Sequence, residues 1–206
     1  MPFDQPLILG FDTSAAHCAA VLLSGDRIIA GLAEDMSKGQ AERLVPLLQE
    51  VLAKAGASWN DLNALGVGIG PGNFTGIRIS VATARGLAMG LDIAAVGVSG
   101  FEALAFGTTR PFAALIDAPR AQVYRQDYLE DECLAPRLQL RLDADAETAH
   151  AGLATPAPLP PLVLAERIAR IAATRWQTES APPAPLYMRP ADAATARDAP
   201  PVILAS

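Results

Sequence analysis

Hydrophobic and polar positions along the chain first predict the opening of a mixed sheet. Residues 7–11 form a short apolar run that ends at an aspartate, and two further apolar runs, 18–23 and 27–33, are separated by a Ser-Gly-Asp turn. Short apolar runs bounded by turn residues are typical of strands, and a tight glycine turn between two of them indicates a hairpin. We therefore expect a strand followed by a hairpin, with an aspartate at the end of the first strand.

The next part of the chain shows the apolar spacing of a helix. Apolar residues recur at three- and four-residue spacing over 44–55, which places them on one face of a helix. Pro46 is tolerated if this helix begins near Glu42, because first-turn amides have no partner within the helix. Gly56 is expected to end it.

The next apolar run, 64–69, indicates a strand that leads into a glycine-rich segment, GPGNFTG at 70–76. A helix is expected over 75–89, ended by Gly90. The later pattern predicts a strand over 94–98, a short helix capped by Ser99 up to residue 106, strands over 112–117 and 122–129, and a helix over about 162–174.

Composition and charge narrow the function. The 206 residues are 51% hydrophobic, enough to bury a substantial core, and the net charge is −6. A protein that binds nucleic acid alone is expected to carry a basic surface, so another subunit must supply most of any contact with RNA. The N-terminus lacks a basic leader and no apolar run is long enough for a membrane span, so a cytoplasmic protein is expected. The two cysteines have no metal-site spacing.

The glycine-rich segment fits neither the P-loop nor the dinucleotide-binding pattern. It still places a strand end before a helix N-terminus, an arrangement that suits an anion, with Gly70, Gly72, Asn73 and Thr75 at the corner. The favoured interpretation is that the glycines permit a sharp corner with positive φ. A remnant of a phosphate-binding site is the second interpretation.

Carboxylates at strand ends are the other candidates. Asp12, followed by Thr13 and Ser14, and Asp117 each end an apolar run. Two such carboxylates facing one cleft suit a metal–phosphate complex, and the ordinary alternative is a turn or a helix cap. Asp12, Ser14 and His17 are also triad residue types, but neighbours on a hairpin seldom converge as nucleophile, base and orienting acid. A protease is therefore not supported.

Several segments, in this order, resemble the bacterial TsaB (YeaZ) family: LGFDTS at 9–14, ERLVPLLQEVL at 42–52, GIGPGNFTGIRIS at 68–80, GLAMGLDIAAVGVSGFEALA at 86–105, ALIDAPRAQVY at 114–124 and PLYMRP at 185–190. The resemblance implies an α/β fold of the actin-like ATPase (ribonuclease H-like) type with two related lobes. The lobes are expected at 1–106 and 107–206, the second trimmed and ending in a proline-rich tail.

The resemblance also implies a role. Members of the family are non-catalytic partners in making threonylcarbamoyladenosine at position 37 of tRNA. They bind and stabilise the catalytic transferase subunit TsaD, help to recruit the small ATPase TsaE, form homodimers when alone and meet tRNA only indirectly. The metal-binding histidines of the catalytic relative have no counterpart in KGQAERLVP at 38–46. No metal and no cofactor is therefore expected for this chain, and ATP only at the level of the complex.

The family's partner-binding helices correspond to 42–55 and 75–89. The expected interface residues are Arg43, Leu44, Leu47, Ile77, Arg78, Val81, Ala82, Arg85, Gly86 and Met89. Small residues at 82, 86 and 90 recur every four positions and would let a second helix approach closely. The alternative is a stand-alone ATP-binding phosphotransferase of the same fold that uses Asp12 and Asp117. A second glycine-rich strand-to-helix loop, which such an enzyme would use, is missing from the later sequence.

Overall fold

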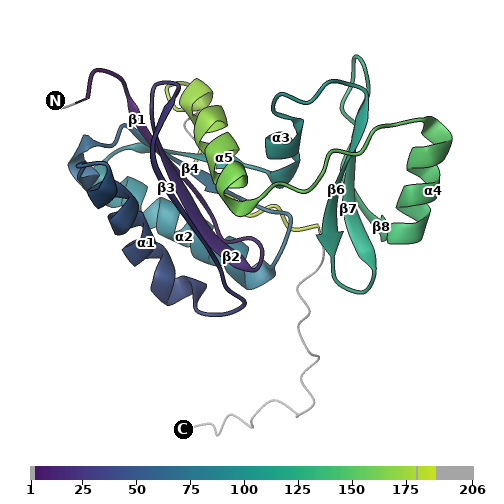
Figure 1. The fold of residues 1–206 in the computed structure, drawn as a ribbon, viewed down its shortest axis with the longest axis horizontal. Helices are drawn as coiled ribbons and strands as arrows, with labels where there is room; N and C mark the ends of the chain where they lie inside the picture. Colours follow the sequence, from purple (N-terminus) through teal and green to yellow (C-terminus); the bar gives the residue numbers. More distant parts are fainter. Residues whose placement is uncertain (1–2, 180, 189–206) are drawn as a thin grey trace, which may run out of the picture.

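The computed structural model describes residues 3–179 and 181–188 and contains a five-stranded and a three-stranded sheet (Figure 1). The elements are β1 Leu7–Asp12, β2 His17–Ser24, β3 Arg27–Asp35, α1 Gln40–Lys54, a 3-10 turn Trp59–Asp61, β4 Ala64–Gly68, α2 Phe74–Leu91, β5 Ala94–Val98, α3 Gly100–Ala105, β6 Phe112–Ala118, β7 Gln122–Tyr128, β8 Arg137–Leu140, α4 Arg141–Ala151 and α5 Pro161–Arg175. Within this described part, no helix is both long and apolar enough to cross a membrane.

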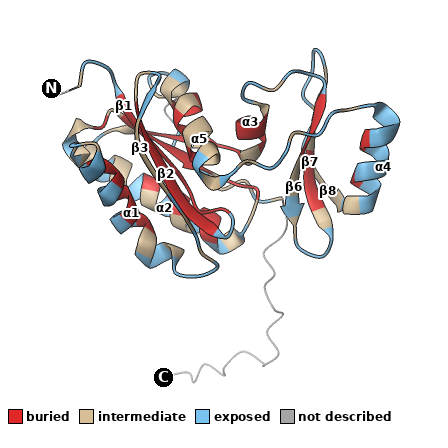
Figure 2. Cartoon of the chain, viewed as in Figure 1, coloured by how far each residue is buried: buried red, intermediate tan, exposed pale blue. Residues whose placement is uncertain are grey.

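The five-stranded sheet has the order β3-β2-β1-β4-β5, with β1 in the centre. β1 runs antiparallel to β2 and parallel to β4. Alternate residues of β1 face opposite sides, so that Leu9 packs toward α1 and α2 while Ile8 packs toward α5. Helices therefore cover both faces, which is why β1 reads as a continuous apolar run. Figure 2 shows buried residues along the central strands of this sheet. The expected strand, hairpin and α/β fold class are confirmed.

α5 lies close against this sheet because glycines face it. A Cβ built on Gly10 would lie 2.6 Å from the Ala165 carbonyl oxygen and 2.6 Å from the Ala169 Cβ. Gly66 faces the next turn of α5 in the same way, since a Cβ built on it would lie 2.9 Å from the Ala172 Cβ. Paired small residues thus let the helix backbone approach the strands. The expected lobe boundary at residue 106 therefore does not match the packing. α5 follows that boundary in the sequence, yet it packs on the first sheet.

The two long helices differ from expectation at their ends. α1 begins at Gln40, so Pro46 lies in the second turn, and its predicted place in the first turn is wrong. Burial of neighbouring leucines on the sheet stabilises the helix despite the missing amide. α2 continues past Gly90, and Asp92 provides the left-handed cap with a φ of 55°. Aspartate tolerates this conformation, which is why the glycine did not mark the end. Gly56 follows α1 with positive φ, as predicted.

The second sheet has the order β6-β7-β8. β6 and β7 confirm the expected strands, whereas β8 and α4 were not anticipated, because β8 has only four half-buried or exposed residues and α4 buries only Ala144 and Thr148. Phe112 and Tyr128 stack with ring centroids 4.8 Å apart. They join Phe101 of α3 in a small core that links this sheet to the first lobe.

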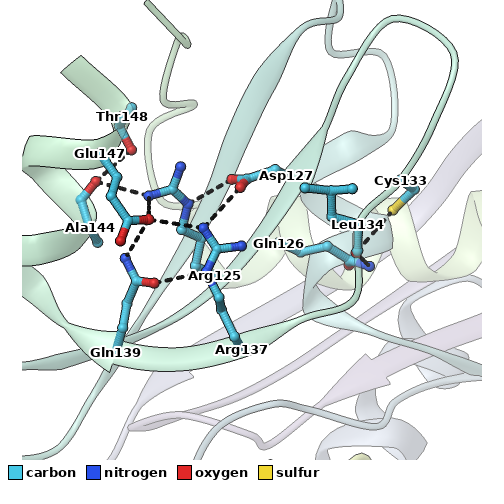
Figure 3. A network of polar contacts seen from close by, with 10 residues as sticks. All are labelled: Arg125, Gln126, Asp127, Cys133, Leu134, Arg137, Gln139, Ala144, Glu147 and Thr148. Carbon is cyan, nitrogen blue, oxygen red and sulfur yellow. Dashed lines mark hydrogen bonds and ion pairs between the residues drawn. The ribbon is translucent and has the colours of Figure 1, made fainter. Parts of the chain in front are cut away.

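A network of charged side chains holds α4 against β7 and β8 (Figure 3). Arg125, only 2% exposed, donates from Nε to Asp127 (2.7 Å) and from Nη1 to Glu147 (3.0 Å). Arg137 donates to the same two carboxylates, and Arg125 also reaches the Ala144 carbonyl oxygen. Two positive and two negative groups satisfy one another, so the network joins the helix to the sheet rather than presenting free charge to a ligand.

Candidate functional site

The glycine-rich corner before α2 is clamped against the turn that follows β1. Thr13 Oγ1 donates to the Gly76 carbonyl oxygen at 2.7 Å, and the Asn73 amide donates to the Ser14 carbonyl oxygen at 2.7 Å. A Cβ on Gly76 would overlap the Thr13 carbonyl oxygen, and one on Gly72 would overlap that of Ser14. These glycines therefore serve the close approach of two loops. Gly70 adopts the expected positive φ, 96°.

The start of α2 is already capped from within the chain. Asn73 Oδ1 accepts from the Gly76 amide at 3.0 Å. Thr75 remains exposed and, with Asn73, lines a cavity of about 320 Å³ that also borders Lys38 and Gly39 at the start of α1. Glu42 borders it as well and offsets the charge of Lys38, so its positive character comes from the two helix N-termini alone. Asp12, Thr13, Ser14, Gly70 and Gly72, predicted with them as a phosphate-binding remnant, do not line it.

Asp12 is enclosed by its own turn and is 1% exposed. Its Oδ1 accepts from the Ser14 amide (2.9 Å) and from Ser14 Oγ (2.8 Å), and lies 2.8 Å from His17 Nε2. The three side chains meet, but not in the order of a catalytic triad, as expected. The carboxylate stands between serine and histidine, whereas a nucleophilic triad places the histidine in the middle. The cluster fixes the turn. Nearby Cys18 is buried, and burial raises the pKa of its thiol to about 11, which disfavours the nucleophilic thiolate.

Asp117 lies elsewhere, in β6 of the second sheet, where it is exposed and pairs with Arg141. Because Asp12 is enclosed and Asp117 faces solvent, the two carboxylates do not face a shared cleft. The described residues also include no group of three or more histidine, cysteine or acidic side chains placed to hold a metal ion. This geometry counts against the phosphotransferase alternative.

The expected interface set divides into buried and exposed residues. Leu44, Leu47, Ile77 and Val81 are at most 3% exposed and belong to the core between sheet and helices. Their prediction as interface residues is wrong, because the apolar face of each helix is already used by the sheet. Arg43 is engaged within the chain as well, since its hydrogen bonds lower the pKa values of both Glu34 and Glu50.

The remaining five residues form an exposed stripe along α2, made of Arg78, Ala82, Arg85, Gly86 and Met89. Their spacing of three and four residues places them on one side of the helix. Met89 is 85% exposed, and a Cβ on Gly86 would have no neighbouring atom within 4 Å. Arg85, Gly86 and Met89 also line a groove of about 550 Å³. Its other wall comes from the start of β5 and residues 181–183. We call these five residues the α2 stripe.

Sequence reasoning missed the part that the C-terminal segment plays at this face. The Leu186 amide donates to the Ile69 carbonyl oxygen at 2.8 Å, which brings residues 185–188 beside the glycine-rich corner. Tyr187 then packs on Phe74 in the first turn of α2, with ring centroids 4.8 Å apart. The only signal for this contact was the PLYMRP segment of the resemblance. Its last two residues, 189 and 190, lie outside the described part.

Comparisons with known proteins agree with one another. The family model described as tRNA N6-adenosine threonylcarbamoyltransferase (TsaD) matches residues 32–174. The tRNA threonylcarbamoyladenosine biosynthesis protein TsaB of Escherichia coli K12 is 37% identical over 131 residues, which are 61% of this chain and 56% of that protein. The chain therefore aligns with little more than half of this relative's length.

Two further similarities cover nearly the whole chain. An uncharacterized protein of Mycobacterium tuberculosis H37Rv is 31% identical over 196 residues, 90% of this chain and 93% of that protein. A crystal structure of a Pseudomonas aeruginosa protein, described as similar to the peptidase YeaZ, superimposes with a TM-score of 0.71 at 26% identity. It covers 90% of this chain and all of that chain. The similarity thus includes both sheets.

Proposed function

The chain belongs to the TsaB (YeaZ) family, and we propose that it is the non-catalytic scaffold subunit of the complex that makes N6-threonylcarbamoyladenosine in tRNA. In this role it binds and stabilises the catalytic transferase subunit TsaD and helps to recruit the ATPase TsaE. Alone, it forms a homodimer through the same surface that binds TsaD. Contact with tRNA falls mainly to the other subunits, in keeping with a net charge of −6.

The α2 stripe is the observation that carries this proposal. A surface helix normally presents charged or long polar side chains to water. Here two of the five stripe residues, Ala82 and Gly86, are small, and a third, Met89, is almost fully exposed. Small residues let a second helix come close, and an exposed methionine adapts to the surface that covers it. Both features favour a protein partner on this side of α2.

The contacts of the candidate catalytic residues favour a non-catalytic role for this chain. Ser14 and His17 both contact the enclosed Asp12 carboxylate, which leaves neither as a free nucleophile or base. Asp117 is committed to Arg141 on another sheet. The reaction is therefore assigned to the partner subunit.

Light scattering after size exclusion tests the proposal, first on this protein alone and then mixed with TsaD from its own organism. We expect a dimer-sized peak that converts to a one-to-one heterodimer. Gly86→Leu should abolish the heterodimer while circular dichroism remains that of a folded protein, because the added side chain projects into open space. Ala146→Leu, on the exposed side of α4, is the matched control and should leave the heterodimer intact. A folded Gly86→Leu variant that still forms the heterodimer would contradict the proposed interface.

A further inference from the structure

We propose that Arg78 binds a carboxylate side chain of the partner subunit, and that Phe74 and Tyr187 are positioning residues that hold it for this contact. The inference rests on the proposed role of the α2 stripe as the partner interface. It adds the chemistry that the partner must present there: an aspartate or glutamate opposite the first turns of α2.

Arg78 is held from two sides. Its guanidinium carbon lies 4.0 Å from the centre of the Phe74 ring, one turn earlier on α2, and 5.9 Å from the centre of the Tyr187 ring. Its Nε donates to Tyr187 Oη at 2.9 Å. Ring stacking sets the plane of the guanidinium, and the hydrogen bond sets its direction within that plane. The two positioning residues come from segments more than a hundred positions apart.

The end of the guanidinium is left for a ligand. Arg78 is exposed, and within the described part of the chain its hydrogen bonding is limited to the one bond from Nε. Nη1 and Nη2 form a planar fork of donors that matches two oxygens of a carboxylate or a phosphate. An arginine already fixed in place loses less rotamer freedom when it binds, so a contact at this fork is stronger than one made by a free side chain.

Carboxylate is favoured over phosphate by the surroundings. A surface that binds RNA backbone uses several cations together, and this chain has only 16 lysines and arginines against 22 acidic residues. Along the stripe, Ala82 and Gly86 suit a packed protein helix, and the second cation, Arg85, lies two turns beyond Arg78. A carboxylate on that helix would meet the fork at the edge of the contact.

Arg85 supplies the internal comparison. It lies two turns further along the same stripe and lines the groove, but it has neither a stacked ring nor a hydrogen-bonding partner among the described residues. Both arginines contribute the same charge to the interface. They differ in that only Arg78 is fixed before binding, so any difference between matched variants reports the fixed geometry.

The experiment is isothermal titration calorimetry of the full chain with TsaD from its own organism. Arg78→Lys keeps the charge and removes the stacked fork, so the dissociation constant should rise about tenfold, the loss of roughly 1.4 kcal/mol. Tyr187→Phe keeps the ring and removes the hydroxyl group, and should raise the constant about threefold. Arg85→Lys should change it less than twofold.

Three results would overturn the inference. If Arg78→Lys binds within twofold of the wild type while Gly86→Leu does not bind, the α2 stripe is the interface and the carboxylate contact is wrong. If Arg78→Lys instead weakens retention of tRNA in a gel-shift assay and leaves the affinity for TsaD unchanged, the fork binds phosphate. Failure of the wild-type protein itself to bind TsaD would remove the proposed function and this inference with it.

Discussion

The same substitution, glycine to alanine, should have opposite effects on stability at two positions. Gly86 lies inside α2, and a Cβ there has open space around it. Gly10 lies in the central strand β1, where a Cβ would lie 2.6 Å from the Ala165 carbonyl oxygen and 2.7 Å from the Ala169 amide nitrogen. The methyl group of Gly86→Ala therefore meets no neighbouring atom, whereas that of Gly10→Ala collides with the backbone of α5.

The magnitudes follow from these surroundings. In an exposed helix interior alanine is favoured over glycine by about 1 kcal/mol, so Gly86→Ala should stabilise the isolated chain by about that amount. At Gly10 the helix backbone must move away from the sheet, so the cost lies near the upper end of the about 1–3 kcal/mol typical of overpacking. The smaller loss of chain entropy offsets part of that cost, which leaves a net destabilisation of about 2 kcal/mol.

Thermal unfolding followed by circular dichroism measures both variants. Gly86→Ala should raise the melting temperature by about 2–4 °C and Gly10→Ala should lower it by about 4–8 °C in a chain of this size. Each variant is measured at two protein concentrations, because dimer formation would add a concentration-dependent term. A Gly10→Ala variant as stable as the wild type would refute the close packing of α5 on β1. A destabilised Gly86→Ala variant would refute the open space along the α2 stripe.

Three further predictions concern single side chains. Asp12→Ala should lower the free energy of unfolding by about 2–4 kcal/mol in urea titrations, because its turn loses three buried hydrogen-bonding contacts; an unchanged midpoint would contradict this. Burial alone would raise the pKa of Glu102, but hydrogen bonds from Ser99 and Arg175 outweigh it and hold the pKa below its usual value. The carboxylate therefore stabilises the fold above about pH 4.3 and ceases to do so as the pH falls through the lowered pKa. Melting curves of Glu102→Gln should depend less on pH between about 5 and 3, and a slope equal to that of the wild type would contradict the assignment. Pro46→Ala should raise the melting temperature by several degrees, since it restores an amide donor inside α1; a lower melting temperature would show that the proline ring makes a stabilising contact.

The elements of the first lobe were predictable because their signals are local. Short apolar runs and tight turns indicate strands, and the apolar spacing over 44–55 indicates a helix whichever surface covers it. The corner after β4 was also predictable in kind, since glycine and asparagine have specific uses at turns and helix starts. Less regular elements escaped prediction. β8 is short, and α4 is mostly polar, so neither carries a periodic apolar pattern.

The interface residues show where local patterns stop being informative. Apolar spacing predicts which face of a helix is buried but does not say whether the sheet or another protein covers it. The family resemblance assigned Leu44 and Ile77 to a partner, although they pack into the chain's own core. Only the structure shows which side of α2 packs on the sheet, and therefore which residues form the exposed stripe.

The sequence by itself determined the order of elements in the first lobe, the family and the absence of known nucleotide-binding motifs, because each depends on residues close together in the chain. Tertiary structure alone decided that α5 returns to the first sheet, that Ser14 and His17 both turn to Asp12, and that Tyr187 meets Arg78. The physical reason is that such contacts depend on shape and burial summed over the whole chain. The packing of α5 on strand glycines and the contact between Arg78 and Tyr187 each join segments far apart in the chain, so no single stretch of sequence predicts them.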